Sequence, residues 1–185
     1  YEYPPITALQ AMRTQVDPAA LSGTIIMVHI ANMPSFLGRT IYYSPVDSKN
    51  LNRMFPGDPN GTISQRIAHI LTTEVIDQAN YVVDLHAGDG NEALRPYVYM
   101  PVTGNAVFDS EIEGLAVAFG LDHIVMDTGP QHASGPSLFT DQTALERGIP
   151  AITTETGKSG SNAPYWAGLA ERGIWNVLRH LDMIA

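Results

Sequence analysis

Short apolar segments alternate along this chain with segments of helical periodicity, and this alternation constrains the fold more than any other feature. Continuous apolar runs are typical of buried strands, whereas apolar residues three and four positions apart mark one face of a helix. The pattern predicts strands at residues 24–30, 81–85, 97–100, 123–126 and 151–154. It predicts helices at residues 3–16, 63–75, 108–119, 137–147 and 169–181, and a long loop over residues 32–59. Strands separated by helices predict an α/β sandwich with a largely parallel or mixed sheet.

Length and charge narrow the class of protein. A chain of 185 residues suits one compact domain. The net charge of −9 and the scattering of only 10 Lys and Arg residues argue against nucleic-acid binding, which needs clustered basic side chains. No apolar run approaches the roughly 20 residues that cross a bilayer, so no membrane partner is predicted and cytoplasm is the simplest location. Because the chain has no cysteine, any metal must be held by His, Asp or Glu, a set consistent with catalytic zinc.

Polar side chains follow three of the predicted strands at the point where each strand ends. Asn32 comes after residues 24–30, His86 after residues 81–85, and Glu155 after residues 151–154. In open α/β sheets, functional residues lie at the carboxyl ends of the strands. The sequence therefore predicts one site at which these segments converge.

His86 is the candidate metal ligand among the six histidines. An imidazole at a strand end, followed by two small residues, is open to a cleft. Asp84 lies two positions earlier on the same face of the strand, where its carboxylate would orient the imidazole from behind. The residues alone also allow a plain hydrogen-bonded histidine that caps the strand. Of the other histidines, only His132, in the Gly-, Pro- and Ser-rich residues 128–136, remains a candidate for a more distant site.

Further candidates lie in the two polar loops. Glu155 stands beside a glycine-rich turn and is suited to act as a general base for a metal-activated water, although an ordinary surface glutamate is the alternative. Asn52 and Arg53 are adjacent in the loop of residues 32–59 and present planar donors suited to holding a carboxylate. Arg39, upstream in the same loop, would polarise a carbonyl. The alternative for each arginine is a solvated surface charge.

Taken together, these segments resemble the succinylglutamate desuccinylase/aspartoacylase family of the zinc carboxypeptidase-like superfamily. The matching pieces are Glu2-Tyr3, Arg39 with residues 47–57, residues 84–87 and residues 149–157, and they follow the family's order over nearly the whole chain. The strings Asn-Leu-Asn-Arg-x-Phe-Pro-Gly and Asp-Leu-His are specific in combination. The resemblance implies a three-layer α/β/α sandwich with a mixed, largely parallel central sheet, like that of the zinc carboxypeptidases.

The resemblance also implies one zinc ion per site. The family's first metal motif is His-Gly-x-Glu, and the start of this chain is similar to its second half, which makes Glu2 a zinc ligand together with His86. A third ligand, a histidine, is expected two positions before Tyr1. Family members usually carry a smaller β-rich domain after the closing helix, so residues 1–185 are expected to form a catalytic domain without its start and without that second domain.

The remaining roles follow from the same resemblance. Glu155 is expected to be the catalytic general base, Arg39 the carbonyl-polarising group, and Asn52 with Arg53 the groups that bind a substrate carboxylate. These roles predict a zinc-dependent hydrolase that cleaves the amide of a small N-acyl amino acid. Two alternatives stay open, a metallocarboxypeptidase acting on peptide C-termini and a metal-free binding domain of the same fold. Each of these is compatible with a homo-oligomer.

Overall fold

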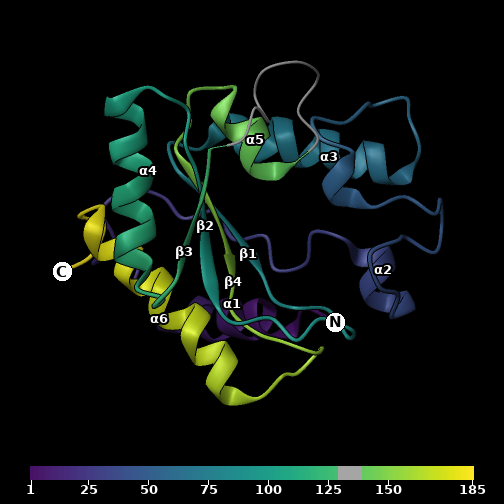
Figure 1. Cartoon of the computed structure of the whole chain (residues 1–185), viewed down its shortest axis with the longest axis horizontal. Coiled ribbons are helices and arrows are strands. Elements are labelled where there is room, and N and C mark those ends of the chain that lie inside the picture. The colour runs from purple at the N-terminus through teal and green to yellow at the C-terminus, as the bar shows by residue number, and fades with distance from the viewer. Residues whose placement is uncertain (129–138) are drawn as a thin grey trace.

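The computed structural model describes residues 1–128 and 139–185 around a four-stranded sheet (Figure 1). The strands are β1 (Val82–His86), β2 (Tyr97–Pro101), β3 (Ile124–Asp127) and β4 (Ala151–Glu155), in the order β1-β4-β2-β3. β1 runs parallel to β4 and β2 runs parallel to β3, whereas β2 and β4 are antiparallel. The mixed sheet that the sequence predicts is therefore confirmed.

Helices lie on both sides of this sheet. They are α1 (Tyr3–Gln15), α2 (Met33–Gly38), α3 (Ile63–Glu74), α4 (Ala106–Phe119), α5 (Thr140–Leu145) and α6 (Pro164–His180), with short 3-10 helices η1 (Leu51–Arg53) and η2 (Ile76–Gln78). α1 packs on α6, α6 packs on α4, and α4 contacts β2 and β4, while α5 contacts β1 and β4. In Figure 1, α4 and α6 lie on one side of the strands and α3 and α5 on the other, which gives the expected α/β/α arrangement. None of the helices in the described ranges is both long and apolar enough to cross a bilayer.

Local sequence signals explain where the longer helices begin and end. α3 starts at the predicted capping box, where the backbone N–H of Thr62 donates to the side chain of Gln65 at 3.0 Å. Asn105 caps α4 by accepting from two backbone N–H groups of its first turn. Gly120 ends α4 at φ +80°, a left-handed conformation that glycine adopts without strain. Proline in the first turn favours the starts of α1 and α6.

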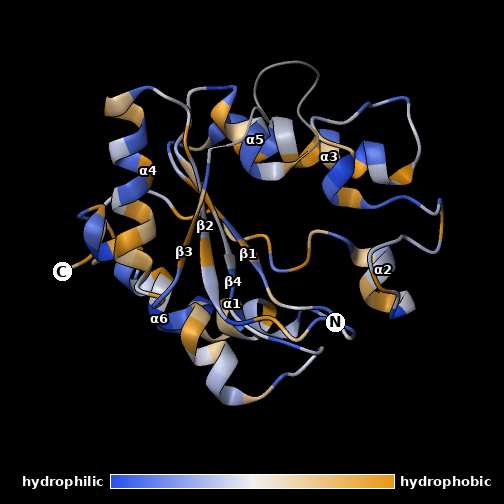
Figure 2. Ribbon diagram, viewed as in Figure 1, coloured by the Kyte–Doolittle hydropathy of each residue, from blue (hydrophilic) through white to orange (hydrophobic). Residues whose placement is uncertain are grey.

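The core joins the sheet to helices on both of its sides, with Ala68 of α3 and Leu145 of α5 in the same buried cluster as residues of α4 and α6. Figure 2 shows hydrophobic residues along β2 and β3, while α4 alternates between hydrophobic and hydrophilic residues. Leu115 and Phe119 of α4 are fully buried, as is Ile152 of β4. α6 approaches α4 closely at Gly173, where an added Cβ would lie 2.4 Å from the ring of Phe119. This sheet-and-helix core holds the ends of β1 and β4 in fixed positions.

Two expectations about secondary structure are wrong. Residues 24–30 form no strand, because the extended segment has no hydrogen-bonded strand partner, and Ile26 and Val28 remain 48% and 36% exposed. The predicted loop over residues 32–59 contains α2 and η1. The other predicted strands and helices are present with boundary shifts of a few residues, and the first part of the helix predicted at 137–147 lies outside the described residues.

Candidate active site

The carboxyl ends of two neighbouring strands form the centre of the site. β1 and β4 are parallel, and His86 pairs in register with Glu155. Residues paired in this way project from the same face of a sheet, so both side chains lie at one edge of that face. The third predicted strand-end residue, Asn32, follows no strand; it caps α2, accepting from the backbone N–H of Ser35 at 3.1 Å, and it lines the same cavity as His86 and Glu155.

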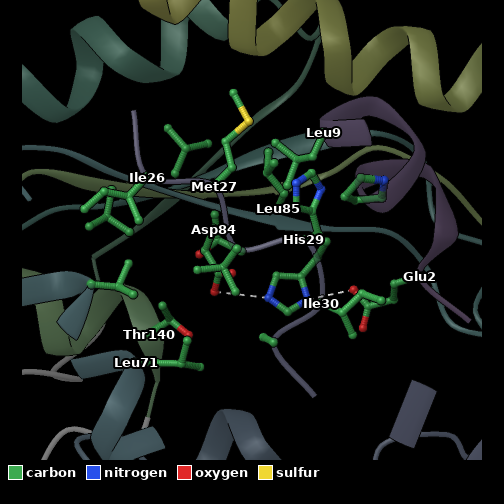
Figure 3. A pocket seen from close by; sticks show the side chains of 18 of the residues that line it. Glu2, Leu9, Ile26, Met27, His29, Ile30, Leu71, Asp84, Leu85 and Thr140 are labelled. Atoms are coloured by element: carbon green, nitrogen blue, oxygen red, sulfur yellow. Dashed lines mark hydrogen bonds and ion pairs between the residues drawn. The ribbon is translucent and has the colours of Figure 1, made fainter. Parts of the chain in front are cut away.

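The imidazole of His86 lies between two carboxylates. Its Nδ1 is 2.8 Å from Oε2 of Glu2, and its Nε2 is 3.1 Å from Oδ2 of Asp84. Dashed lines in Figure 3 mark both contacts, with Asp84 and Glu2 on opposite sides of the ring. The same Glu2 oxygen accepts from the backbone N–H of Ala87 at 3.0 Å. The start of α1 is thus tied to the end of β1, and three residues that the sequence singles out are in direct contact.

Opposite charges stabilise the contacts among these three partly buried side chains. Burial alone would lower the pKa of His86, but the carboxylates of Asp84 and Glu2 outweigh burial and raise that pKa well above its usual value. Burial alone would raise the pKa of Glu2 and of Asp84, but the charge on His86 lowers both below their usual values. Without a metal, the three groups therefore form a carboxylate–imidazolium–carboxylate array.

Glu155 has a different environment from the other two carboxylates. Its Oε2 atom is buried and has no hydrogen-bond partner in the described parts of the chain. Burial raises the pKa of Glu155 to about 8, against the lowering effect of His86, and the charge of Glu2 adds to the rise. A carboxyl group whose pKa lies near neutrality can both take up and release a proton under ordinary conditions. Of the carboxylates in the site, Glu155 is thus suited to carry protons.

The donor set fits two ligands of a catalytic zinc site. Imidazole nitrogen and carboxylate oxygen are both zinc ligands, and a ligating histidine typically donates its other ring N–H to a carboxylate, as His86 Nε2 is placed to do with Asp84. No cluster of three or more His, Asp or Glu side chains able to hold a metal occurs in residues 1–128 and 139–185. A catalytic zinc usually has three protein ligands, so the pair Glu2 and His86 is one short of a full set. The third ligand, expected before Tyr1, stays a prediction.

Asn52 and Arg53 lie in η1, whose backbone is fixed by Asn50. The side chain of Asn50 accepts from the backbone N–H of Asn52 at 3.0 Å. The Oδ1 of Asn52 accepts from the backbone N–H of Thr140 at 3.0 Å. The guanidinium of Arg53 lies 4.4 Å from the centre of the Phe139 ring, which favours a cation by its electrostatic field. Both side chains are therefore held on an ordered turn.

A single cavity of about 1030 Å³ contains most of the predicted residues. Six of them line it: Glu2, Asn52, Arg53, Asp84, His86 and Glu155. Another part of its wall is apolar and includes residues 25–28, Leu71 and Val177. Arg39 is not part of this wall; it is exposed at the end of α2, in a left-handed conformation with φ 50°. The expected role of Arg39 stays a prediction, and His132 lies outside the described residues.

Sequence reasoning missed some members of the site. Thr140 lines the cavity, and its backbone N–H donates to the side-chain oxygen of Asn52. A threonine at the start of a short helix carries no sequence signal for such a role. Asp89 and Glu92 also line the cavity, and burial together with the charge of Glu2 raises the pKa of Asp89. The predicted site is thus more acidic than its expected residues alone suggest.

Comparison with known proteins assigns the chain to a family. A model of the succinylglutamate desuccinylase/aspartoacylase catalytic domain matches residues 1–181. The chain belongs to this family. The family resemblance seen in the motifs is thereby confirmed. N-alpha-acetyl-L-2,4-diaminobutyric acid deacetylase from Halomonas elongata is 34% identical over 185 residues, which cover 99% of this chain and 52% of that protein.

Solved structures show the same desuccinylase/aspartoacylase fold. A succinylglutamate desuccinylase/aspartoacylase from Rhodobacter sphaeroides matches with a TM-score of 0.89 and 30% identity, over 100% of this chain and 53% of that one. The product-bound ectoine utilization protein EutE (DoeB) from Ruegeria pomeroyi matches with a TM-score of 0.89 and 27% identity, over 99% of this chain and 54% of that one. The chain spans about half the length of these relatives.

Proposed function

We propose that this chain is the catalytic domain of a zinc-dependent deacylase that hydrolyses the amide of an N-acyl amino acid. The observation that carries the proposal is the single cavity that brings together the pair Glu2 and His86, the proton carrier Glu155 and the donors Asn52 and Arg53. Membership of the desuccinylase/aspartoacylase family supports the reaction class.

Glu2 and His86 would hold the zinc ion, and Asp84 would keep the imidazole in place by accepting from Nε2. Zinc supplies a Lewis acid that makes water more acidic and polarises a carbonyl. In the absence of metal, the contact of 2.8 Å between Glu2 and His86 is a hydrogen bond, so metal binding displaces the proton between them.

The side chains of this site then have separate roles in substrate binding and in proton transfer. Arg53 and Asn52 bind the carboxylate of the substrate and so fix the amide relative to Glu155. Glu155 takes a proton from the attacking water as a C–O bond forms at the acyl carbon. It returns that proton to the amide nitrogen as the C–N bond breaks, which releases a carboxylic acid and an amine. Arg39 is proposed to stabilise charge on the carbonyl oxygen, which requires its segment to move toward the cavity.

The acidic character of the cavity favours substrates whose amino acid part carries a second, cationic amine. Asp89 and Glu92 line the same cavity as Glu2, and carboxylates attract an ammonium group. The relative from Halomonas elongata is named as a deacetylase of an acetylated diamino acid. We therefore propose N-acetylated diamino acids as the first substrates to test.

The test compares substrates on the full-length protein. Amine release is measured with N-acetylated diamino acids, with N-acetyl and N-succinyl amino acids, and with short unblocked peptides. The deacylase proposal expects turnover of the N-acyl amino acids, with loss of turnover when the substrate carboxylate is replaced by an amide. Turnover of peptides alone would support the carboxypeptidase alternative. Absence of both zinc and turnover would support a metal-free binding domain.

A further inference from the structure

Phe139 and Thr140 contact the turn that carries Asn52 and Arg53. Phe139 is the N-cap of α5, and Thr140 is the first residue of that helix. The backbone N–H of Thr140 donates to Oδ1 of Asn52 at 3.0 Å, and the guanidinium carbon of Arg53 lies 4.4 Å from the centre of the Phe139 ring. Two adjacent residues at the start of α5 thus contact two adjacent residues of η1. We propose that Phe139 is a positioning residue that holds the guanidinium of Arg53 ready to bind the substrate carboxylate.

Phe139 supports Arg53 from outside the cavity. Arg53 lines the cavity wall, as do Asn52 and Thr140, whereas Phe139 is not part of that wall. A side chain outside the wall does not contact a ligand in the cavity, so the ring acts on the substrate only through Arg53. The face of an aromatic ring attracts a cation through its quadrupole, and this attraction leaves the N–H groups of the guanidinium available for hydrogen bonds.

The guanidinium of Arg53 is available to an anionic ligand. Its Nη1 atom donates to the backbone carbonyl of Asn52. Within residues 1–128 and 139–185, no carboxylate forms an ion pair with Arg53, although the net charge of the chain is −9. A guanidinium binds a carboxylate through two parallel N–H···O bonds, and the remaining donors of Arg53 can form these bonds with the substrate.

A guanidinium that is held before binding raises the affinity for the carboxylate. An exposed arginine such as Arg53 samples many rotamers, and this freedom is lost when a ligand fixes the side chain. The contact with Phe139 restricts the side chain in the absence of substrate, so less freedom is lost on binding. The substrate carboxylate keeps its charge throughout the reaction, so the contact contributes equally to the binding of substrate and of transition state. Loss of the ring is therefore expected to raise KM with little change in kcat.

The experiment uses variants of Phe139 in the full-length protein. Phe139→Leu keeps an apolar side chain and removes the aromatic face. Phe139→Met removes the face with an unbranched side chain and serves as the second variant if leucine impairs folding, while Phe139→Tyr retains the face. Phe108→Leu is the matched control, because Phe108 is a half-buried phenylalanine of α4 that packs on the core and does not line the cavity. The kcat and KM values are measured on an N-acetylated diamino acid.

The inference expects KM to rise about 3- to 30-fold in Phe139→Leu and Phe139→Met, the range of a cation–π contact, while kcat changes less than about threefold. Phe139→Tyr should stay within about threefold of the wild type, and Phe108→Leu should leave KM unchanged. In an Arg53→Ala background, Phe139→Leu should raise KM by less than about twofold, because the side chain that the ring holds is already absent.

Three results overturn the inference. The first is an unchanged KM in both variants that lack the aromatic face. The second is a tyrosine variant as impaired as the leucine variant, because tyrosine keeps the ring that carries the contact. The third is a rise in KM on Phe139→Leu that is equally large with and without Arg53, since the ring would then act through packing and not through the guanidinium.

A readout without substrate separates this inference from the proposed function, on which it rests. Nuclei that lie over the face of an aromatic ring experience its ring current, so the NMR resonances of the Arg53 side chain in the metal-free protein report on the contact with Phe139. The inference expects Phe139→Leu to move these resonances toward those of a free arginine and Phe108→Leu to leave them unchanged. A wild-type protein that turns over no N-acyl amino acid contradicts the proposed function alone. Arg53 resonances unmoved in Phe139→Leu contradict the positioning by the ring itself.

Discussion

Replacement of Glu155 by glutamine should stabilise the metal-free protein while it removes activity. Glu155 has a pKa of about 8, against an ordinary value of 4.5, because burial penalises its charge. Below pH 4.5 both the folded and the unfolded chain bind this proton. Between pH 4.5 and 8 the unfolded chain releases the proton while the folded chain retains it, so stability falls as the pH rises through this interval. Above pH 8 the Glu155 carboxyl is ionised in both the folded and the unfolded chain, so stability falls no further.

The size of the effect follows from these two values. Each pH unit between 4.5 and 7 is worth about 1.36 kcal/mol, so burial of this carboxyl lowers the free energy of unfolding at pH 7 by at most about 3 kcal/mol. Glutamine has nearly the same shape and no charge, so Glu155→Gln should recover most of this free energy. The variant should also lose the dependence of stability on pH in this window. If Glu155 is the general base, kcat should fall by about 10²- to 10⁴-fold.

Denaturant unfolding of the full-length protein in chelator, at several pH values from 4 to 9, measures the first effect. Glu111→Gln is the matched control, because Glu111 is exposed on α4 and its loss should change stability by less than about 0.5 kcal/mol. Addition of zinc should reduce the difference in the free energy of unfolding between wild type and Glu155→Gln, because a nearby cation favours the ionised carboxylate of the wild type. A variant no more stable than wild type at pH 7, or a wild-type stability that is flat between pH 5 and 8, would refute the reasoning.

Three further variants test the metal site, the substrate site and the core. His86→Ala should lose stoichiometric zinc, and zinc occupancy equal to wild type by elemental analysis would show that the ligand assignment is wrong. Arg53→Lys replaces a planar fork with a point charge and should raise KM for an N-acyl amino acid by about tenfold with a smaller change in kcat; an unchanged KM contradicts its role. Gly173→Ala gains about 1 kcal/mol of helix propensity but places a Cβ 2.4 Å from the Phe119 ring, at an overpacking cost of about 1–3 kcal/mol. Net destabilisation in denaturant is expected, with partial recovery when Phe119→Leu is added, and a stabilised single variant would contradict this packing.

The fold could be predicted from the sequence where periodicity and turn residues agree. The capping box at Thr62 and the glycine at Gly120 mark real helix ends, because these signals act through bonds within a few residues. The strand predicted at the apolar residues 24–30 is absent, because an apolar segment forms a strand only when another strand lies beside it. Hydrophobicity alone carries no information about that neighbour.

The residues of the candidate site could likewise be predicted only in part. The sequence does not predict the order of the strands in the sheet. The rule that functional residues follow strand ends nevertheless placed His86 together with Glu155, because β1 and β4 are parallel neighbours in which these two residues pair. Asn32 lines the same cavity, but it reaches it from the cap of α2 and not from a strand end, because its preceding segment is not in the sheet. For Glu2, only the family resemblance gave a role.

The sequence by itself determined the alternation of strands and helices, the absence of thiolate ligands and the family motifs that nominate the site residues. Only the tertiary structure decided that Glu2 lies against His86, that the Oε2 atom of Glu155 is buried without a hydrogen-bond partner among the described residues, and that Thr140 donates to Asn52. The physical reason is the range of each interaction. Propensity and capping act between neighbours along the chain, whereas Glu2 and His86 are 84 positions apart and Thr140 and Asn52 are 88 apart. Such contacts, and the pKa values that depend on them, exist only after the sheet has brought distant segments to one edge.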